Sequence, residues 1–189
     1  MLVLLSRRAD PATLERFLAR AVQEPLSYAE VAAILDDPPP GYRHDDDTRV
    51  VGHGADAFTR AVDGVRTWRA HRAAGIRLLT SAPGLHEGVT VAMALPCFGV
   101  FALAACRVVA VVDEPDRFGF VYGTLHSHPE RGEESFVVTR ADDTVTFRIA
   151  SFSRPADPLA RLGAPVARRV QRRVTLAYFD GLAAFVDGR

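Results

Sequence analysis

A run of strand-like segments in the middle of the chain constrains the fold more than any other feature. Between residues 76 and 152, stretches rich in Val, Phe, Thr and Ile alternate with short turn sequences that contain Pro, Gly or Asp. Because short connections between consecutive strands build antiparallel meanders, we expect one antiparallel sheet. The expected strands are Ile76–Thr80, Val89–Leu95, Val100–Asp113, Phe118–Leu125, Glu133–Arg140 and Thr144–Phe152.

Helical patterns precede this run. The pair Asp10-Pro11 supplies an acidic N-cap and a proline at the first helical position, and the apolar spacing that follows predicts a helix over 11–22. A capping box that begins at Ser27 predicts a short helix over 27–35. The N-terminal segment is therefore expected to be mainly helical.

A third helix is expected from about 55 to 72, with Trp68 on its apolar face. After the strands, Asp157-Pro158 opens the last helical region, which a Gly-Ala-Pro sequence at 163–165 should kink or divide. Beyond it, one face of the helix is expected to carry Val166, Val170, Val174, Ala177, Gly181 and Phe185.

Helices, then strands, then one long helix predict an α+β fold with segregated layers. The length of 189 residues fits one domain, 1–189, with a helical segment over 1–40 and a core over 41–189. This pattern does not indicate an oligomeric state.

Composition excludes several classes of protein. Basic and acidic residues number 23 each, so no net charge recruits nucleic acid. Two cysteines are too few for a disulfide framework, and we expect a reduced, cytoplasmic protein. The apolar stretch 95–112 is interrupted by Pro96, Gly99 and Arg107, whereas a spanning helix needs about 20 apolar residues, so no membrane span is expected. No phosphate loop or other cofactor motif occurs, and we expect no cofactor.

The densest polar cluster is the segment 122–134, which contains His126 and His128. Two histidines at this spacing lie on one face of an extended chain, and carboxylates follow, so a metal site could be assembled from them. Because no third-ligand signature accompanies them, a hairpin loop with polar turn residues is the better interpretation, and we expect no metal.

Glu134 is the residue of this cluster that is most suited to chemistry. Alternation places Glu134 and Phe136 on one face of a strand and Glu133 on the other. If the aromatic face of 118–122 coincides with the first of these, Glu134 lies among rings on the concave side. A buried carboxylate needs a partner, and Arg107 in a neighbouring apolar strand is the candidate. A structural Arg107–Glu134 pair and a ligand-anchoring or acid/base role fit this pattern equally well.

Two charged stretches favour contact with solvent. His44–Asp47 follows a proline-rich connector and is interpreted as a solvated loop. Arg168–Arg173 lacks interleaved aromatic residues and is interpreted as a solvated helix face.

Short motifs carry a resemblance to a known family. They include Ala105-Cys106-Arg107-Val108-Val109, Tyr122-Gly123-Thr124-Leu125, His128-Pro129-x-x-Gly132-Glu133-Glu134-x-Phe136, Pro40-Gly41-Tyr42, Ser153-Arg154-Pro155 and Gln171. On these motifs, which extend over about 27–185, the chain resembles domain-of-unknown-function family 1990. His71 and Ile76 stand where larger aromatic residues are expected, so any pocket there should differ in shape.

That family is similar, more distantly, to the START and Bet v 1-like helix-grip proteins. The resemblance implies a curved antiparallel sheet wrapped around a long C-terminal helix, with extra N-terminal helices. It also implies a mostly apolar cavity between the sheet and that helix. It implies neither a ligand nor a reaction, because fold analogy alone does not supply function.

Three functions fit these observations. The first is binding of a hydrophobic or amphipathic small molecule, lipid-like or polyketide-like, in that cavity. The second is an enzyme, such as a cyclase, hydratase or hydrolase, with Glu134 or His128 as the acid or base. The third is a regulatory domain that binds another protein through the Arg-rich last helix and holds no ligand. The residues expected at a ligand are Trp68, Arg107, Phe118, Phe120, Tyr122, Glu134, Phe136 and Phe147.

Overall fold

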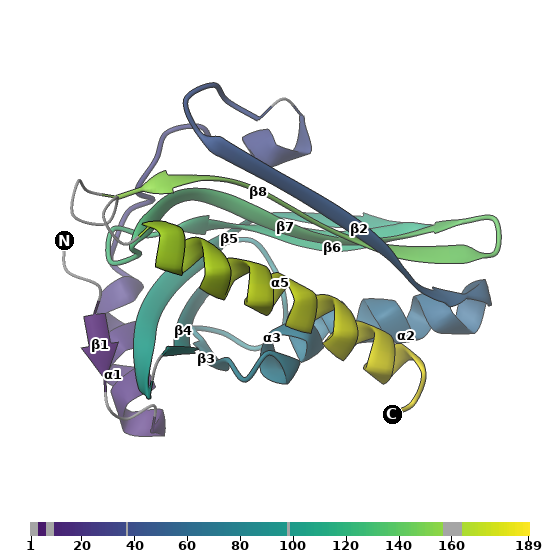
Figure 1. Cartoon of the computed structure of the whole chain (residues 1–189), viewed down its shortest axis with the longest axis horizontal. Coiled ribbons are helices and arrows are strands. Elements are labelled where there is room, and N and C mark those ends of the chain that lie inside the picture. The colour runs from purple at the N-terminus through teal and green to yellow at the C-terminus, as the bar shows by residue number, and fades with distance from the viewer. Residues whose placement is uncertain (1–3, 7–9, 37, 98, 157–163) are drawn as a thin grey trace.

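The computed structural model describes residues 4–6, 10–36, 38–97, 99–156 and 164–189, and one antiparallel sheet forms its centre (Figure 1). Seven strands follow the order β2-β8-β7-β6-β5-β4-β3, and β1 pairs with β5 outside this path. The strands are β1 (Leu4–Ser6), β2 (Arg43–His53), β3 (Arg77–Thr80), β4 (Thr90–Cys97), β5 (Val100–Glu114), β6 (Arg117–Thr124), β7 (Glu130–Ala141) and β8 (Thr144–Pro155).

The predicted meander is confirmed, since each strand from β3 to β8 pairs antiparallel with the next along the chain. The bounds of these strands agree with the sequence prediction to within about three residues, because the period-2 pattern and the turn residues are local signals. The long strands curve, and their concave side faces the C-terminal helix (Figure 1).

The edge strand β2 is a correction to the sequence prediction. His44–Asp47 was expected as a loop, but these residues lie in β2, where Asp45 pairs with Ser151 and Asp47 with Ile149 of β8. Side chains from Arg43 to Val50 are exposed, so the segment lacks the alternating apolar pattern that identifies a strand. Pairing with β8 orders it, and charged side chains are usual on an edge strand because they oppose further pairing.

The N-terminal segment agrees with the prediction in its first half only. Helix α1 (Pro11–Ala21) begins as expected, with the Asp10 side chain accepting a 2.8 Å hydrogen bond from the Thr13 amide. The capping-box helix over 27–35 is wrong, since this segment contains only the 3-10 turn η1 (Ala33–Leu35). The Ser27 hydroxyl forms a hydrogen bond with Thr124 on β6 instead of capping a helix.

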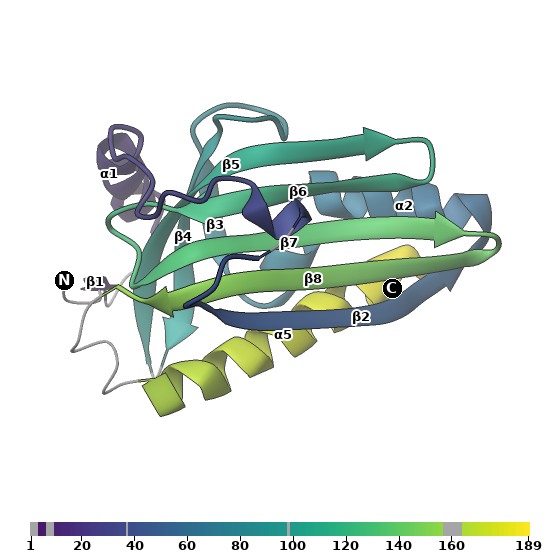
Figure 2. The same ribbon diagram turned by 90° about the horizontal axis from the view of Figure 1, so that it is seen from above.

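The predicted third helix is divided in two. Helix α2 (Gly54–Arg66) and helix α3 (Arg69–Ala73) are separated at Trp68, whose backbone lies in the left-handed region with φ of 59°. The Trp68 side chain is buried, as expected, and contacts Phe120 of β6. The change of direction lets both helices cover the concave face of the sheet (Figure 2).

Helix α5 (Ala164–Val186) lies along the concave face. The expected helix start at Asp157-Pro158 and the first residue of the Gly-Ala-Pro sequence lie outside the described residues. The expected inward face is displaced by about one residue, because the fully buried positions are Tyr178, Phe179, Leu182 and Val186. Gly181 and Gly64 permit close packing of α5 on its neighbours, since a Cβ at either would lie within 2.5 Å of Ala73 or Leu182.

Both faces of the sheet are covered. The concave face carries the largest apolar cluster, which joins β4 to β8 with α2, α3 and α5. On the convex face, α1 packs on β4 and β5, and the segment around η1 packs on β6 and β8. None of the helices in the described part of the chain is long and apolar enough to cross a membrane.

Candidate functional site

The concave face carries a row of polar side chains across four strands. Tyr122 of β6 pairs with Glu134 of β7, Glu134 with Ser151 of β8, and Ser151 with Asp45 of β2. The predicted alternation is confirmed, because Phe136 of the same strand face joins the concave apolar cluster. Glu134 therefore lies among aromatic rings, as the sequence indicated.

Glu134 is held by a tyrosine pair. The Tyr122 hydroxyl donates a 2.7 Å hydrogen bond to Glu134 Oε2, and Tyr178 of α5 is hydrogen-bonded to Tyr122. Removal from bulk water raises the pKa of Glu134 to about 7, and the charges of Glu130 and Asp45 add to this effect, while the Tyr122 bond opposes it. The side chain nevertheless keeps partial contact with solvent. Such a carboxyl can take up or release a proton near neutral pH.

A second polar contact joins β7 to α5. Gln171 Nε2 donates a 2.7 Å hydrogen bond to Glu130 Oε2, and the Ser153 hydroxyl also bonds to Glu130. Burial raises the pKa of Glu130, and these two bonds oppose the rise. Within the described ranges, no group donates to Gln171 Oε1, although this atom is buried.

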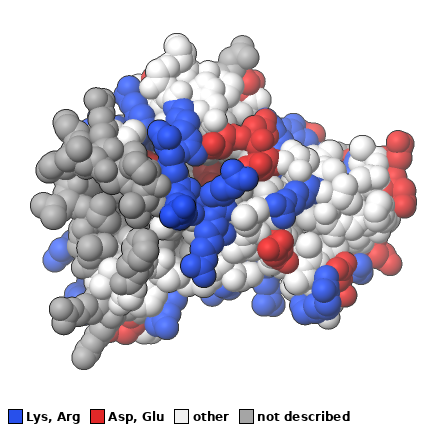
Figure 3. Space-filling model, in the orientation of Figure 1, with Lys and Arg blue, Asp and Glu red and all other residues white. Residues whose placement is uncertain are grey.

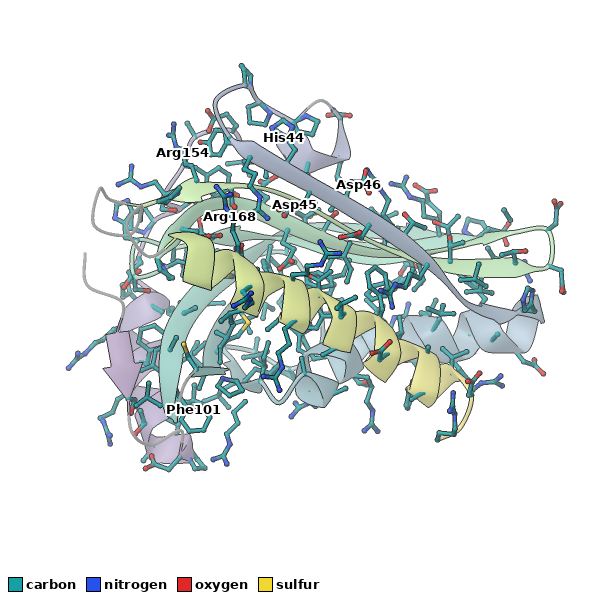
Figure 4. All side chains as sticks on the ribbon, in the orientation of Figure 1. His44, Asp45, Asp46, Phe101, Arg154 and Arg168 are labelled. Carbon is teal, nitrogen blue, oxygen red and sulfur yellow. The ribbon has the colours of Figure 1, made fainter. Side chains whose placement is uncertain are left out.

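We give the name α5 crevice to the polar group formed by these residues of the sheet and α5: Asp45, Glu130, Glu134, Ser151 and Gln171. All five keep partial or full solvent exposure. Figure 3 shows a hollow with acidic atoms inside it and basic atoms around it, above the N-terminal half of α5. In Figure 4, Asp45 on β2 and Arg168 on α5 lie at the same end of this opening.

His71 of α3 lies behind the crevice in a ring cluster. Its imidazole is 1% exposed, and its centroid lies 4.7 Å from both Phe136 and Tyr178 and 6.0 Å from Tyr122. Burial lowers the pKa of His71 to about 3, so the ring is neutral. Its Nε2 atom has no hydrogen-bond partner among the residues that the structure describes.

The aromatic residues expected at a ligand lie on the concave face and contact one another. Phe120 stacks on Phe136 at 5.1 Å and meets Trp68 at 4.7 Å, and Phe136 lies 6.3 Å from Phe147. Phe118 belongs to the same buried cluster. These side chains fill the space between sheet and helices, and their role as ligand-lining residues stays a prediction.

The proposed Arg107–Glu134 pair is wrong. Arg107 Nη2 donates to the Val22 carbonyl at 2.9 Å, just beyond α1, and Nε donates to Thr90 at 3.2 Å. Arg107 thus points to the convex face, whereas its neighbours Cys106 and Val108 belong to the concave cluster. The ligand-binding role predicted for Arg107 therefore has no place in the α5 crevice.

The two histidines of the polar segment lie in the turn between β6 and β7, not in an extended strand. His126 is exposed, while His128 Nδ1 accepts a 3.0 Å hydrogen bond from the Glu130 amide. Burial lowers the pKa of His128 to about 4. The turn agrees with the hairpin interpretation, and no cluster of metal-ligating side chains is found within the described ranges.

Sequence reasoning missed four crevice residues, Asp45, Glu130, Ser151 and Gln171, and two residues beside the crevice, His71 and Tyr178. Gln171 belongs to the family motifs and His71 stands where a larger aromatic residue is expected, so both residues stand out in the sequence, but neither has a predicted role. The sequence predicts a solvated loop at Asp45, so no role in a site follows for it from the sequence. Tyr178 could have been predicted at the site only if the inward face of α5 had been predicted correctly.

Comparisons with known proteins concern the family and the fold of this chain. A relative from Deinococcus radiodurans, described as a UPF0548 protein, is 36% identical over 187 residues, covering 89% of this chain and 91% of its own. Ara h 8.0201 superposes with a TM-score of 0.56 at 12% identity, covering 79% of this chain and 100% of that one. A further match is the di-domain ARO/CYC StfQ from the steffimycin biosynthetic pathway, with a TM-score of 0.55 at 14% identity, covering 78% and 52%.

These structural matches show the fold alone, which is the Bet v 1-like helix grip expected from the sequence. The family model described as "Domain of unknown function (DUF1990)" matches residues 27–181, a span that includes β2 to β8 and most of α5. Both the crevice and its supporting elements lie inside that span. The chain is therefore a member of the DUF1990 family.

Proposed function

We propose that this protein binds a hydrophobic or amphipathic small molecule between the sheet and α5, with the polar end of the molecule in the α5 crevice. The observation that carries the proposal is Glu134, a partly exposed residue whose carboxyl group is hydrogen-bonded to Tyr122 among the aromatic rings of the concave face. Small-molecule sites combine an apolar surround with a few oriented polar groups in this way.

The contacts available to a ligand divide into two kinds. Tyr122 and Glu134 form a hydrogen-bonded pair, and Gln171 of α5 is bonded to Glu130 of the same strand as Glu134. The rings of Phe136 and Tyr178 border these groups, with centroids 5.4 Å apart. The polar pair orients a head group, and the rings contact the apolar part of the molecule.

The fold supports the same function. In helix-grip proteins, a C-terminal helix and the concave face of the sheet enclose one interior space. One structural neighbour is described as a protein of a biosynthetic pathway. In this chain much of that interior is filled by aromatic side chains. The bound molecule is therefore expected to be small, or to contact the rings at the edge of the cluster.

The proposal is tested by native mass spectrometry of the purified protein, followed by identification of any molecule released on denaturation. We expect a near-stoichiometric apolar molecule in the wild type and its loss in Ser151→Leu, which fills the crevice floor. Thr146→Leu is the matched control, because Thr146 lies on the convex side of the same strand. An empty wild-type protein that also fails to take up a panel of fluorescent lipids would overturn the proposal.

A second function, acid/base catalysis on the same molecule, is favoured by one observation. Glu134 has a pKa of about 7 and a tyrosine hydroxyl beside it, whereas the pKa of His128 is lowered to about 4. Glu134 is thus the group suited to proton transfer near neutral pH. With the ligand identified, Glu134→Gln should lower turnover by about 100-fold in an enzyme, but should weaken affinity only a few-fold in a binding protein.

A further inference from the structure

Three carboxyl groups converge on the α5 crevice: Asp45 from β2, and Glu130 and Glu134 from β7. Their charges act on one another, since those of Glu130 and Asp45 add to burial in raising the pKa of Glu134, and that of Asp45 raises the pKa of Glu130. Like charges have this effect where they share poorly screened space. Acidic side chains therefore line the interior of the crevice, where Figure 3 shows acidic atoms inside a hollow.

The positive charges near the crevice are either paired with an aspartate or exposed to solvent. Arg43 forms an ion pair with Asp45 and lowers the pKa of Glu130, while Arg49 lies 3.5 Å from an aspartate of α5. Arg168 and Arg172 are exposed side chains of α5. Side chains on the solvent side are screened by water and salt, so they act weakly on groups at the floor.

A separate observation concerns buried hydrogen-bonding atoms. Gln171 directs its amide nitrogen to Glu130, which leaves the buried Oε1 atom as an acceptor with no donor in the described part of the chain. His71, 1% exposed, also has a buried Nε2 atom without a partner among those residues, and its ring lies against Tyr178 and Tyr122 at the crevice floor. The buried acceptor of Gln171 would be satisfied by a ligand that brings an N–H donor.

We propose that the ligand of the α5 crevice presents a protonated amine to Glu134 and Glu130. An ammonium group supplies both the positive charge that the carboxylates favour and the donors that Gln171 lacks. The inference rests on the proposed function and narrows its ligand class to a cationic amphiphile.

The test compares three molecules with the same dodecyl chain: dodecylammonium, dodecanol and dodecanoate. The only tryptophan of the chain, Trp68, lies 5.0 Å from His71, so its fluorescence reports binding near the crevice. At about pH 8, where Glu134 is ionised, we expect dodecylammonium to bind about 10-fold or more tightly than dodecanol, and dodecanoate to bind most weakly. Equal or tighter binding of dodecanol or dodecanoate would overturn the inference and leave the proposed function standing. If none of the three binds, the inference is overturned, and native mass spectrometry decides the proposed function separately.

Variants that each remove one negative charge test whether the preference for dodecylammonium arises in the crevice. Glu134→Gln and Asp45→Asn should each reduce the preference for dodecylammonium over dodecanol by several-fold. Asp46→Asn is the matched control, because Asp46 adjoins Asp45 but bonds to Arg148 on the convex side. Circular dichroism confirms that each variant is folded. An equal loss in Asp46→Asn would assign the preference to the general field of the protein and contradict a site in the crevice.

Discussion

Two neighbouring glutamates, one on the convex and one on the concave face of the sheet, differ in how many hydrogen bonds they accept. Glu133 is 2% exposed on the convex face and accepts hydrogen bonds from the Tyr28 hydroxyl at 2.7 Å and from the amides of Ala32 at 2.6 Å and Ile34 at 3.1 Å. Glu134, on the concave face, accepts one bond, from Tyr122, among the residues described. One carboxylate is fully used in fastening a segment of chain, and the other keeps spare hydrogen-bonding capacity.

The convex contact also depends on a glycine. A Cβ at position 123 would lie 1.9 Å from the Tyr28 hydroxyl, so only glycine lets this ring reach Glu133. The segment over 27–35 has little helix of its own and is positioned by these contacts. The difference teaches that burial alone does not separate the two glutamates; unused bonding capacity beside an opening makes Glu134 the candidate for a functional role.

The largest effect on stability is expected for Glu133→Gln, compared with the same substitution at Glu134. Glu133→Gln places an NH₂ group against backbone N–H donors, and we expect it to lower the free energy of unfolding by about 2–4 kcal/mol. Glu134→Gln still accepts from Tyr122, and we expect a change within about 1 kcal/mol. Urea unfolding at about pH 7 measures both variants. Equal losses would show that Glu134 is as structural as Glu133.

The pH dependence of stability sharpens the comparison. An unfolded glutamate loses its proton near its ordinary pKa of 4.5, whereas folded Glu134 keeps the proton to about 7. Between these values the folded state binds more protons, so the contribution of Glu134 to stability is present below about pH 4.5 and is lost as the pH rises to about 7. We expect wild type to lose about 2 kcal/mol relative to Glu134→Gln across this range.

Urea unfolding at intervals from about pH 4.5 to 8 measures that difference, and groups common to both proteins cancel in it. A difference that is constant with pH would mean that Glu134 ionises as it does in the unfolded chain. Acid/base catalysis by Glu134 near neutral pH would then have no support.

His71 offers a smaller effect on the concave side. Its buried Nε2 lacks a partner among the described residues, and its neutral ring has a pKa near 3. His71→Phe should raise the free energy of unfolding by about 1 kcal/mol at neutral pH, because no polar atom is then buried unpaired. The gain should grow as the pH falls below 6.5, since the unfolded histidine takes up a proton there and the folded one does not. Thermal unfolding of His71→Phe beside His126→Phe, an exposed control, would contradict this if the two behave alike.

The sequence could predict what depends on neighbours along the chain. The strands from β3 to β8 and the opposite faces of Glu133 and Glu134 follow from the period of two and from turn residues, and the structure confirms them. The approach of Tyr122 to Glu134 followed from matching aromatic faces on adjacent strands. Their role at a ligand remains a prediction.

What depends on tertiary contacts could not be predicted. β5 is covered by the core on one face and by α1 on the other, so its continuous apolar run does not show which way Arg107 points. Strand β2 is ordered by pairing with β8 rather than by its own exposed and acidic residues. The division of the helix at Trp68 likewise follows from packing of that ring into the core.

The smallest expected effect is a coupling close to zero between Arg107 and Glu134. Because their side chains lie on opposite faces, the double variant Arg107→Met with Glu134→Gln should lose the sum of the two single losses to within about 0.5 kcal/mol. Arg107→Met alone should lose about 1 kcal/mol, through its bonds to Val22 and Thr90. Urea unfolding of the four proteins in the cycle measures the coupling. A coupling of 1 kcal/mol or more would mean that the two faces communicate through the sheet, and the separation between a fastening face and a binding face would then be lost.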